Sequence, residues 1–287
     1  MKIKTEHSKL FFYLLIVSFF FLLFYMILLY SSQVFAFSEP EQTKNISISP
    51  SNEKILKEKI LAKSFAIYDV NQEKIIRGQN SNFPLPIASL TKVITVGTFL
   101  NTAKNSNINL REETKEKIKR ALVQSSNKDA DSLGNIYELS FQKNLLKDSN
   151  NLVKKLGTNS IKLTNLTGLD DENDNASNIG SAEDIAKVFA YMYENHRNVF
   201  EYTKFDELES ENGAIINTNQ KTDSTFGILA SKTGFTNSAG GNLAVIVSPE
   251  PGKTFVIVVM HSTKEGRFAD VQKLVKLLPL IVKEDSK

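Results

Sequence analysis

The hydrophobic positions of the chain follow three different patterns along its length. Residues 10–30 form one continuous apolar run. Two short stretches rich in strand formers, over 64–70 and 74–78, flank the turn Asn71-Gln72 and predict a β-hairpin. Three further β-branched runs, separated by Gly, Pro and Asn, predict strands over residues 226–232, 242–248 and 254–261. Together these five strands predict a single antiparallel sheet.

The middle and the end of the chain show helical spacing instead. Apolar positions three and four residues apart predict helices over residues 90–100, 111–123, 129–137 and 141–156. Another helix follows the capping-box sequence Ser181-Ala182-Glu183-Asp184, and an amphipathic helix covers residues 268–282. The expected fold is α/β, of the α+β type: a five-stranded antiparallel sheet flanked by helices, with a helical subdomain over about 104–200.

The apolar run Leu10–Tyr30 is long enough to cross a bilayer as a helix, and it contains no charged residue. Lysines precede it and none follows closely, so the positive-inside rule keeps the N-terminus in the cytoplasm and exports the remainder. We expect a cytoplasmic tail over 1–9, a transmembrane anchor or signal segment over 10–30, a polar linker over 31–58 and a catalytic domain over 59–287. Cleavage after Ala36 would release a secreted domain, and we favour the uncleaved anchor in a bacterial cell membrane.

Composition excludes several classes of function. The net charge of +3 is small, and the Lys and Arg residues are scattered along the chain, so no nucleic-acid partner is expected. The chain has no cysteine, which excludes disulfides, thiolate metal sites and a cysteine nucleophile. His7, His196 and His261 lack partners at ligand spacing, and the acidic stretch 170–174 lacks the register of a calcium loop. We interpret that stretch as a solvated loop and expect no metal and no cofactor.

Ser89 and Lys92 are the first candidates for chemistry. They are three residues apart at a predicted helix start, so their side chains share one face of the helix. An amine in that position can take the proton of the hydroxyl and turn it into a strong nucleophile. A Ser-x-x-Lys sequence occurs by chance roughly twice in a chain of this size and composition. Taken alone, the motif fits a solvated lysine at an exposed helix start better than it fits a catalytic pair, so the rest of the chain has to supply the support.

Two further motifs follow in order, Ser125-x-Asn127 in the helical part and Lys232-Thr233-Gly234 at the end of a predicted strand. This ordered set is typical of penicillin-binding proteins and related β-lactamases. At these residues the chain resembles the D-alanyl-D-alanine carboxypeptidases, the low-molecular-mass penicillin-binding proteins of peptidase family S11. The resemblance runs from about residue 64 to 278 and includes Gly168-Leu169-Asp170, Phe235-Thr236 and Arg267-Phe268-x-Asp270.

The resemblance implies three catalytic residues. Ser89 would be the acylated nucleophile, Lys92 its general base, and Ser125 the group that relays a proton to the departing D-alanine. A lysine acts as a base only when it is neutral, so burial or a nearby cation must lower the pKa of Lys92, and Lys232 is the obvious cation. The segment between Lys92 and Ser125 is shorter than is usual in the family, which leaves open how Ser125 reaches the nucleophile.

The resemblance also implies a set of substrate-binding residues. Asn127 would hold the peptide group of the substrate, while Lys232 and Thr233 would bind its terminal carboxylate. Gly234 lets the backbone come close, and the N–H groups of Ser89 and Phe235 would form the oxyanion hole. Arg267 is a further candidate for carboxylate binding, and a solvated arginine at a helix start is the alternative interpretation.

The implied function is a serine D-Ala-D-Ala carboxypeptidase outside the cytoplasm. It would remove the terminal D-alanine from peptidoglycan stem peptides through an acyl-enzyme on Ser89, and β-lactam antibiotics would be covalent inhibitors. A D,D-endopeptidase of peptidoglycan cross-links uses the same chemistry and is the nearest alternative. A β-lactamase would need a deacylating base, and no Glu-x-x-Leu-Asn sequence follows Asn127. An inactive wall-binding domain of the same fold, tethered to the membrane, is the last alternative.

Overall fold

The computed structural model describes residues 22, 25, 59–211, 213–222 and 226–285. Apart from Leu22 and Tyr25, the predicted anchor and linker lie outside the described residues. Among the residues that are described, no helix combines the length and the apolar character needed to cross a membrane. Residues 58–287 form one compact unit, and the fold below is the fold of that unit.

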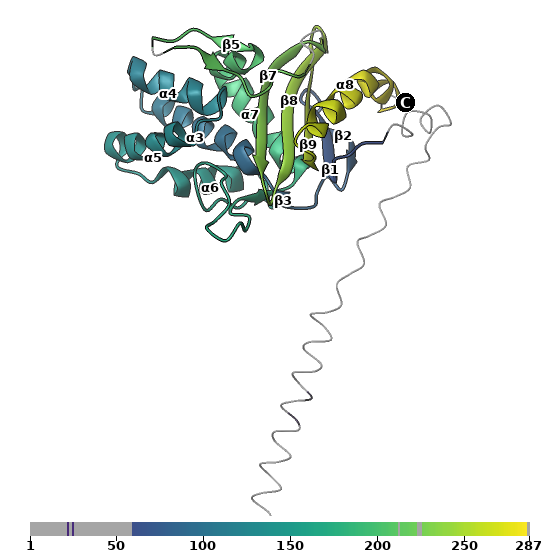
Figure 1. The fold of residues 1–287 in the computed structure, drawn as a ribbon, viewed down its shortest axis with the longest axis horizontal. Helices are drawn as coiled ribbons and strands as arrows, with labels where there is room; N and C mark the ends of the chain where they lie inside the picture. The colour runs from purple at the N-terminus through teal and green to yellow at the C-terminus, as the bar shows by residue number, and fades with distance from the viewer. Residues whose placement is uncertain (1–21, 23–24, 26–58, 212, 223–225, 286–287) are drawn as a thin grey trace, which may run out of the picture. The chain divides into compact units, whose positions relative to one another are not determined.

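A five-stranded antiparallel sheet forms the centre of this unit, as the sequence predicts (Figure 1). Its strand order is β2-β1-β9-β8-β7, so the first hairpin pairs with the last strands of the chain. The pairing of β1 with β9 sets Phe65 opposite Val259. The strands are β1 (Ser64–Asp69), β2 (Lys74–Gln79), β7 (Ile228–Thr236), β8 (Gly240–Glu250) and β9 (Lys253–Ser262).

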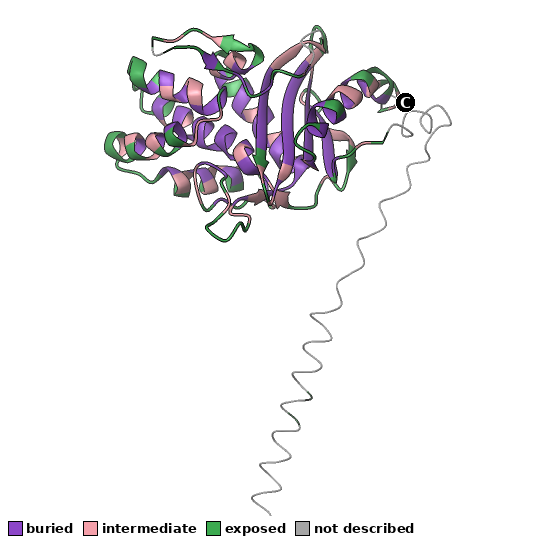
Figure 2. Ribbon diagram, in the orientation of Figure 1, coloured by how far each residue is buried: buried purple, intermediate pink, exposed green. Residues whose placement is uncertain are grey.

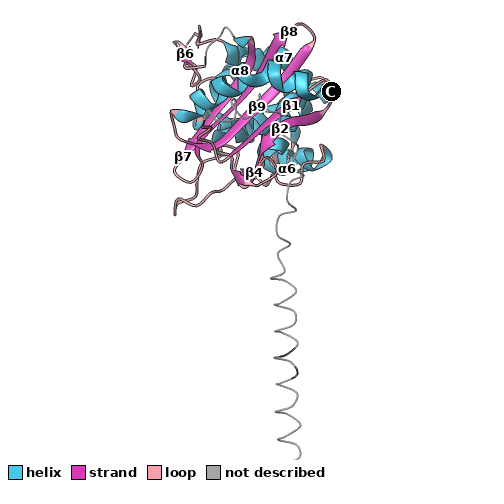
Figure 3. Ribbon diagram, turned by 90° about the vertical axis from the view of Figure 1, so that its right-hand side faces the viewer, coloured by secondary structure: helices cyan, strands magenta, loops and turns pink. Residues whose placement is uncertain are grey.

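Helices cover both faces of the sheet. The C-terminal helix α8 (Gly266–Asp285) packs on one face, and α7 (Ala182–Phe200) packs on the other with α3 (Thr91–Asn105) behind it (Figures 1 and 3). Along β8, Leu243 and Val245 point toward α8, whereas Ala244 and Ile246 point toward α7 and α3. The central strands β8 and β9 are buried along most of their length (Figure 2). A strand buried on both faces needs apolar side chains at consecutive positions, which is why these strands are continuous apolar runs in the sequence.

The remaining helices lie beside α3, away from the sheet (Figure 1). They are α4 (Glu112–Leu122), α5 (Asn127–Phe141) and α6 (Leu145–Lys155). Short 3-10 turns are η1 (Ala88–Leu90) and η2 (Glu201–Lys204). Two small ribbons complete the unit, formed by β3 (Leu85–Pro86) with β4 (Ile179–Gly180) and by β5 (Glu207–Leu208) with β6 (Ile215–Ile216).

The predicted helix over 141–156 begins later than expected. Phe141 is the last residue of α5, and Gln142 ends that helix in the left-handed conformation, with φ of 54°. Asn144 then caps α6, because its side-chain oxygen accepts a hydrogen bond from the backbone N–H of Lys147 at 2.8 Å. Apolar periodicity continues across this break, so spacing alone does not reveal it.

The capping box at the start of α7 is only half formed. Ser181 Oγ accepts a hydrogen bond from the Asp184 N–H at 3.2 Å, as the motif predicts. The Asp184 carboxylate does not return to the Ser181 N–H but accepts from the N–H and the hydroxyl of Ser160. Ser160 Oγ in turn accepts from the Ser181 N–H at 2.8 Å. The motif therefore fastens the preceding loop to the helix as well as capping it.

Asp270 on α8 holds the start of the described unit in place. Its fully buried carboxylate accepts hydrogen bonds from the backbone N–H groups of Leu61 and Ala62, at 2.8 and 2.9 Å. The hydroxyl of Ser262, at the end of β9, donates a third at 2.6 Å. One side chain thus joins α8, β9 and the segment that leads into β1.

Replacing this carboxylate should destabilise the protein markedly. In Asp270→Ala, buried N–H groups lose their acceptor, and we expect the free energy of unfolding to fall by about 2–4 kcal/mol. Urea denaturation of the full chain measures the change. Glu250→Ala is the control, because Glu250 makes an exposed ion pair with Lys253, and it should change stability by less than about 0.5 kcal/mol. Equal effects of the two substitutions would contradict this role of Asp270.

Candidate active site

Ser89 lies on a tight 3-10 turn at the head of α3, not within the α-helix itself. Ala88, just before it, has a φ of 47°, a conformation that residues other than glycine seldom adopt. Hydrogen bonds hold this turn: Thr91 Oγ1 donates to the Ala88 carbonyl at 2.7 Å, and Asn178 Nδ2 donates to Thr91 Oγ1 at 2.9 Å. The Ile87 N–H also donates to the carbonyl of Asn178. Ser89 is therefore presented by a fixed and strained backbone.

The amine of Lys92 is the centre of the site. Its side chain is completely buried, and Nζ lies 2.8 Å from Ser89 Oγ, 2.7 Å from Asn127 Oδ1 and 2.7 Å from the carbonyl oxygen of Thr167. The amide and carbonyl oxygens can only accept hydrogen bonds. A neutral amine has two N–H groups, which these two oxygens occupy, so its lone pair faces the Ser89 hydroxyl. This is the geometry that a general base requires.

Burial brings the pKa of Lys92 into the range where it can act. Desolvation lowers the pKa of Lys92 to about 7, and the nearby Asp131 carboxylate opposes part of that shift. From the sequence we expect the charge of Lys232 to lower the pKa of Lys92. In the structure, burial lowers the pKa of Lys92, and the repulsion between the two lysines lowers the pKa of Lys232 instead. The pKa of Lys232 is well below its ordinary value because of burial and, after it, the charges of Lys92 and Arg267.

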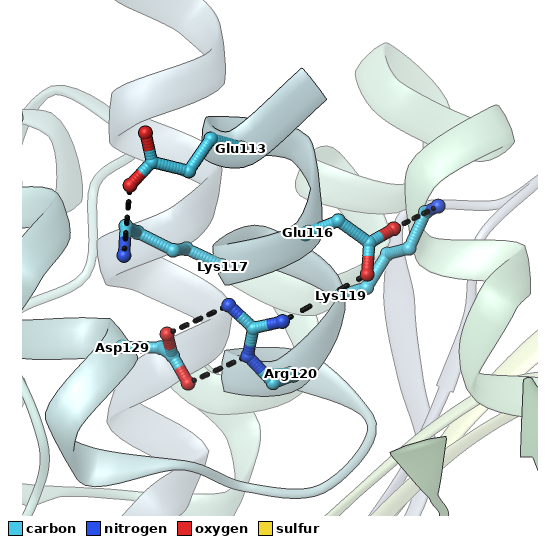
Figure 4. Close-up of polar contacts among 6 residues, drawn as sticks. All are labelled: Glu113, Glu116, Lys117, Lys119, Arg120 and Asp129. Carbon is cyan, nitrogen blue, oxygen red and sulfur yellow. Dashed lines mark hydrogen bonds and ion pairs between the residues drawn. The ribbon is translucent and has the colours of Figure 1, made fainter. Parts of the chain in front are cut away.

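Ser125 and Asn127 reach the centre from the turn between α4 and α5. Ser125 has a φ of 61°, and the next residue, Ser126, caps α5 by accepting from the Asp129 N–H at 3.2 Å. Arg120 on α4 holds the other side of the turn, because its carbonyl accepts from the Ser126 N–H. Its guanidinium grips Asp129 through two nitrogens, at 3.1 and 3.3 Å (Figure 4). The segment between Lys92 and Ser125 is therefore long enough to place Ser125 and Asn127 in contact with the two lysines.

Helix α4 is tied down by more than this one arginine. Glu116 is largely buried and lies between Lys119, at 2.7 Å, and Arg120, at 3.8 Å (Figure 4). Burial acts to raise the pKa of Glu116, but hydrogen bonds from Lys119 and Ser210 hold it below its usual value. Glu113 and Lys117 form another pair one turn apart on the helix. The ion pairs of this charged helix, which the sequence predicts, thus stabilise α4 and the Ser125 turn that follows it.

Lys232 and Thr233 come from the sheet side of the site. The sequence predicts them at the end of a strand, whereas they lie inside β7, which runs on to Thr236 and pairs with β8 throughout. Lys232 is buried, and its Nζ donates to Ser125 Oγ at 2.8 Å and to the Thr233 carbonyl at 2.9 Å. Thr233 Oγ1 donates to Thr218 Oγ1 at 2.6 Å, which links β7 to a residue that no motif marks.

Gly234 allows the strand to touch the turn that carries Ser89. A Cβ at this position would lie 3.1 Å from the Ile87 carbonyl oxygen and 3.2 Å from the backbone nitrogen of Ser89. Both contacts are tighter than side chains normally make, so a larger residue would push β7 away from the turn. The next residue, Phe235, has a side chain that is 43% exposed. The predicted oxyanion hole needs this close approach of the two backbones.

Arg267 is not the solvated arginine of the alternative interpretation. It is only 7% exposed, and its Nη1 donates to the carbonyl of Gly234 at 2.7 Å. The guanidinium also stacks over the ring of Phe268, with Cζ 4.7 Å from the ring centroid. Arg267 therefore supports the strand at the point where it meets the Ser89 turn. A direct contact with a carboxylate stays a prediction.

The loop over residues 165–170 completes the site, and its part in holding Lys92 is not evident from side-chain patterns. The Thr167 carbonyl is one of the three partners of Lys92. Gly168 has a φ of 81°, and a Cβ there would lie 1.9 Å from the Ala88 carbonyl oxygen. Only glycine fits so close to the Ser89 turn. The Gly168-Leu169-Asp170 motif, part of the family resemblance, is the sequence feature that could have marked this loop as belonging to the site.

Asp170 differs from the solvated loop that we predict for the acidic stretch. Its carboxylate accepts from the hydroxyls of Thr236 and Ser238, at 2.9 and 2.6 Å, and from the Ser238 N–H at 3.1 Å. It thereby joins the loop to the end of β7. Within the described part of the chain, no three His, Asp or Glu side chains come together in a way that could hold a metal ion.

Curated relatives and solved structures resemble this chain over most of its described part. The D-alanyl-D-alanine endopeptidases of Escherichia coli and Haemophilus influenzae are each 27% identical to it. The E. coli alignment is 243 positions long and covers 75% of this chain and 76% of that protein. The H. influenzae alignment is 212 positions long and covers 65% of this chain and 70% of that protein.

Solved penicillin-binding proteins share the fold. Penicillin-binding protein D2 of Listeria monocytogenes, in its cefotaxime-bound form, superposes with a TM-score of 0.66 at 24% identity, and the match covers 76% of this chain and 97% of that one. The D-alanyl-D-alanine carboxypeptidase of Mycobacterium tuberculosis gives a TM-score of 0.65 at 19% identity, covering 77% and 92%. At these identities the comparison establishes the fold.

The family assignment comes from the sequence itself. The model of the D-alanyl-D-alanine carboxypeptidase family, Peptidase_S11, matches residues 104–264, which is more than half of the chain. The matched range contains Ser125-x-Asn127 and Lys232-Thr233-Gly234, and the structure brings these two motifs to the Ser89 turn. The chain therefore belongs to peptidase family S11, the serine D,D-peptidases described as D-alanyl-D-alanine carboxypeptidases.

Proposed function

We propose that this protein is a serine D,D-carboxypeptidase that removes the terminal D-alanine from peptidoglycan stem peptides. The observation that supports this most directly is the contact of the Lys92 amine with Ser89 Oγ at 2.8 Å, together with the burial that lowers the pKa of this amine to about 7. Membership of family S11 supports the D,D-peptidase chemistry. The roles below are proposed residue by residue from the geometry.

In the acylation step, Ser89 Oγ attacks the carbonyl carbon of the penultimate D-alanine while Lys92 Nζ accepts the hydroxyl proton. The oxygen of that carbonyl becomes negative and binds the N–H groups of Ser89 and Phe235. The C–N bond then breaks, and the departing amine takes the proton that Lys92 accepted, relayed through the hydroxyl of Ser125, which leaves Lys92 neutral again. An ester on Ser89 and a free D-alanine are the products of this step.

Deacylation reverses the roles around the same atoms. Water attacks the ester carbonyl, Lys92 takes a proton from the water, and Ser89 leaves with its hydroxyl restored. A β-lactam carbonyl would be attacked in the same way, but its amine stays tethered to the acyl group and blocks water. A solved structure of the Listeria monocytogenes relative carries ampicillin, which supports this inhibitor class.

Lys232 and Thr233 supply the recognition of the free carboxylate. An anion beside the buried Lys232 amine would favour its charged form, and thus restore the pKa that burial lowers. The Lys232 amine lies 2.8 Å from Ser125 Oγ, so carboxylate binding and proton relay share one group. We expect carboxylate binding to orient the scissile bond as well as to add affinity.

A D,D-endopeptidase of peptidoglycan cross-links is the second candidate. The observation that favours it is the pair of curated relatives, both of which are D-alanyl-D-alanine endopeptidases. The two reactions share the acyl half of the substrate and differ only in the leaving group. The contacts around Ser89 therefore serve either reaction equally well.

The first prediction is that Ser89 is the acylation site. Ser89→Ala should lower covalent labelling by penicillin more than about a thousandfold, because Ser89 carries the hydroxyl that contacts Lys92 Nζ in the described part of the chain. Intact-mass spectrometry of the full chain gives the measurement. Ser140→Ala, an exposed serine of α5, is the matched control and should label normally. Persistent labelling of Ser89→Ala would move the nucleophile elsewhere, with Ser125 the first suspect.

The second prediction concerns pH. Only the neutral Lys92 amine accepts a proton, so the rate of acylation should rise with pH through about 7 and level off above about 8. Stopped-flow acylation by a chromogenic cephalosporin measures the profile. Asp131→Asn removes a carboxylate that raises the pKa of Lys92, so its profile should shift to lower pH. A rate that still climbs at pH 10 would mean that Lys92 keeps an ordinary pKa.

The third prediction separates the two leaving groups. Purified pentapeptide monomers and cross-linked dimers are offered to the full chain, and kcat/KM is measured for each by chromatography of the products. The carboxypeptidase proposal expects monomers to be trimmed at least about tenfold faster than dimers are cut. Ser89→Ala serves as the blank for contaminating hydrolases. Faster cutting of dimers would reject the carboxypeptidase and favour the endopeptidase.

A further inference from the structure

A concave site lies at the opposite end of α3 from the nucleophile. A hollow of about 570 Å³ opens between the C-terminal end of α3, helix α4 and the end of α7. Lys104 at its edge is twelve residues after Lys92, so about 18 Å of helix separates it from the catalytic amine. The volume is within the usual range of small-molecule sites.

The floor of this hollow is apolar. Leu100, Ala103 and Ile118 line it and are all nearly fully buried. At the mouth, Ile108 remains 42% exposed. An apolar group seated here would cover Ile108 and contact the floor, and burial of that area would favour binding.

The rim of the hollow is basic. Lys104, Lys115 and Lys119 lie around it, with Glu112 as its acidic residue. Lys115 pairs with Glu112 at 3.2 Å, and Lys119 pairs with Glu116 at 2.7 Å. Among the described residues, Lys104 has no carboxylate within ion-pair distance. The rim therefore carries a positive charge that is not neutralised locally.

The wall on α7 is polar but uncharged. His196 interrupts that helix with a φ of −139° and a ψ of 38°, and its Nε2 lies 2.7 Å from Asn101 Oδ1. Burial, helped by the charge of Lys104, lowers the pKa of His196 to about 4, so this imidazole is neutral at physiological pH. The positive charge at the hollow thus belongs to the lysines on one side.

We propose that this hollow binds a small amphipathic anion: a compact apolar body that ends in a carboxylate or a phosphate. The body would lie on Leu100 and Ile118, and the anionic end would meet Lys104 at the rim. Charge complementarity selects the anion, since a cation of the same shape would face Lys104, whose charge no carboxylate of the described residues neutralises, whereas Lys115 and Lys119 are paired. The apolar floor selects against small inorganic anions, which would leave Ile108 exposed.

A photoreactive pair of probes tests the proposal on the full chain. 4-Benzoylbenzoate has two aromatic rings and one carboxylate, and 4-benzoylbenzylamine has the same rings and one ammonium. After irradiation, peptide mass spectrometry locates the crosslinks. We expect the carboxylate to label residues 100–119 or 195–202 at least about fivefold more than the amine does. Equal labelling by the two probes, or labelling only at other residues, would overturn the proposal.

Matched variants sharpen the result. Lys104→Glu should lower labelling by the carboxylate about tenfold, whereas Lys143→Glu makes the same charge change on an exposed residue away from the hollow. Ile108→Ser should lower labelling by both probes, and Leu139→Ser, an exposed leucine elsewhere, should not. Normal penicillin acylation of each variant shows that it is folded, and if Lys104→Glu fails that check, Ile108→Ser decides. Labelling that neither cavity variant lowers would place the anion elsewhere and overturn the proposal.

Discussion

The site depends on one buried amine. Lys92 draws together a hydroxyl from the Ser89 turn, an amide from the start of α5 and a carbonyl from the loop at Thr167. Burying an amine is costly unless its hydrogen bonds are made, and here each has a partner below 3 Å. The burial that opposes folding also lowers the pKa of the group. The stability lost by burying this amine thus keeps part of it neutral at physiological pH, which is the form that the proposed reaction needs.

The sheet contributes a second lysine, Lys232 on β7, whose amine donates a hydrogen bond to Ser125 Oγ. Strand β7 is at the edge of the sheet, yet it is fixed from several directions: Thr218 contacts Thr233, Asp170 contacts Thr236, and Arg267 contacts the carbonyl of Gly234. These contacts bridge the helical part and the sheet. A strand fixed only by its neighbour β8 could slide or twist, whereas β7 is set relative to Ser89 from both sides.

Much of this could be predicted from the sequence, and the failures have physical causes. The five strands follow from apolar β-branched runs, and the residues at the centre follow from three motifs. The Thr167 carbonyl could not be found in this way, because a backbone acceptor leaves no mark on side-chain identity. For Arg267 the sequence leaves carboxylate binding and a solvated arginine both open, and only tertiary packing, which buries the side chain, excludes the second. Lys232 lies inside its strand because pairing with β8 continues past the glycine that seems to end it.

The left-handed backbone at Ser125 sets a limit on how sequences of this kind can drift. At a φ of 61° glycine would have the lower conformational energy, but glycine has no hydroxyl to accept the hydrogen bond from the Lys232 amine. The neighbouring contacts must therefore supply enough stability to keep a serine in a conformation that it disfavours. Mutations that destabilise α4, or that remove the Arg120–Asp129 ion pair, would reduce the stability that holds Ser125 in this conformation, even though they lie outside the site. Natural variation in α4 should for this reason be narrower than its charged, exposed appearance suggests.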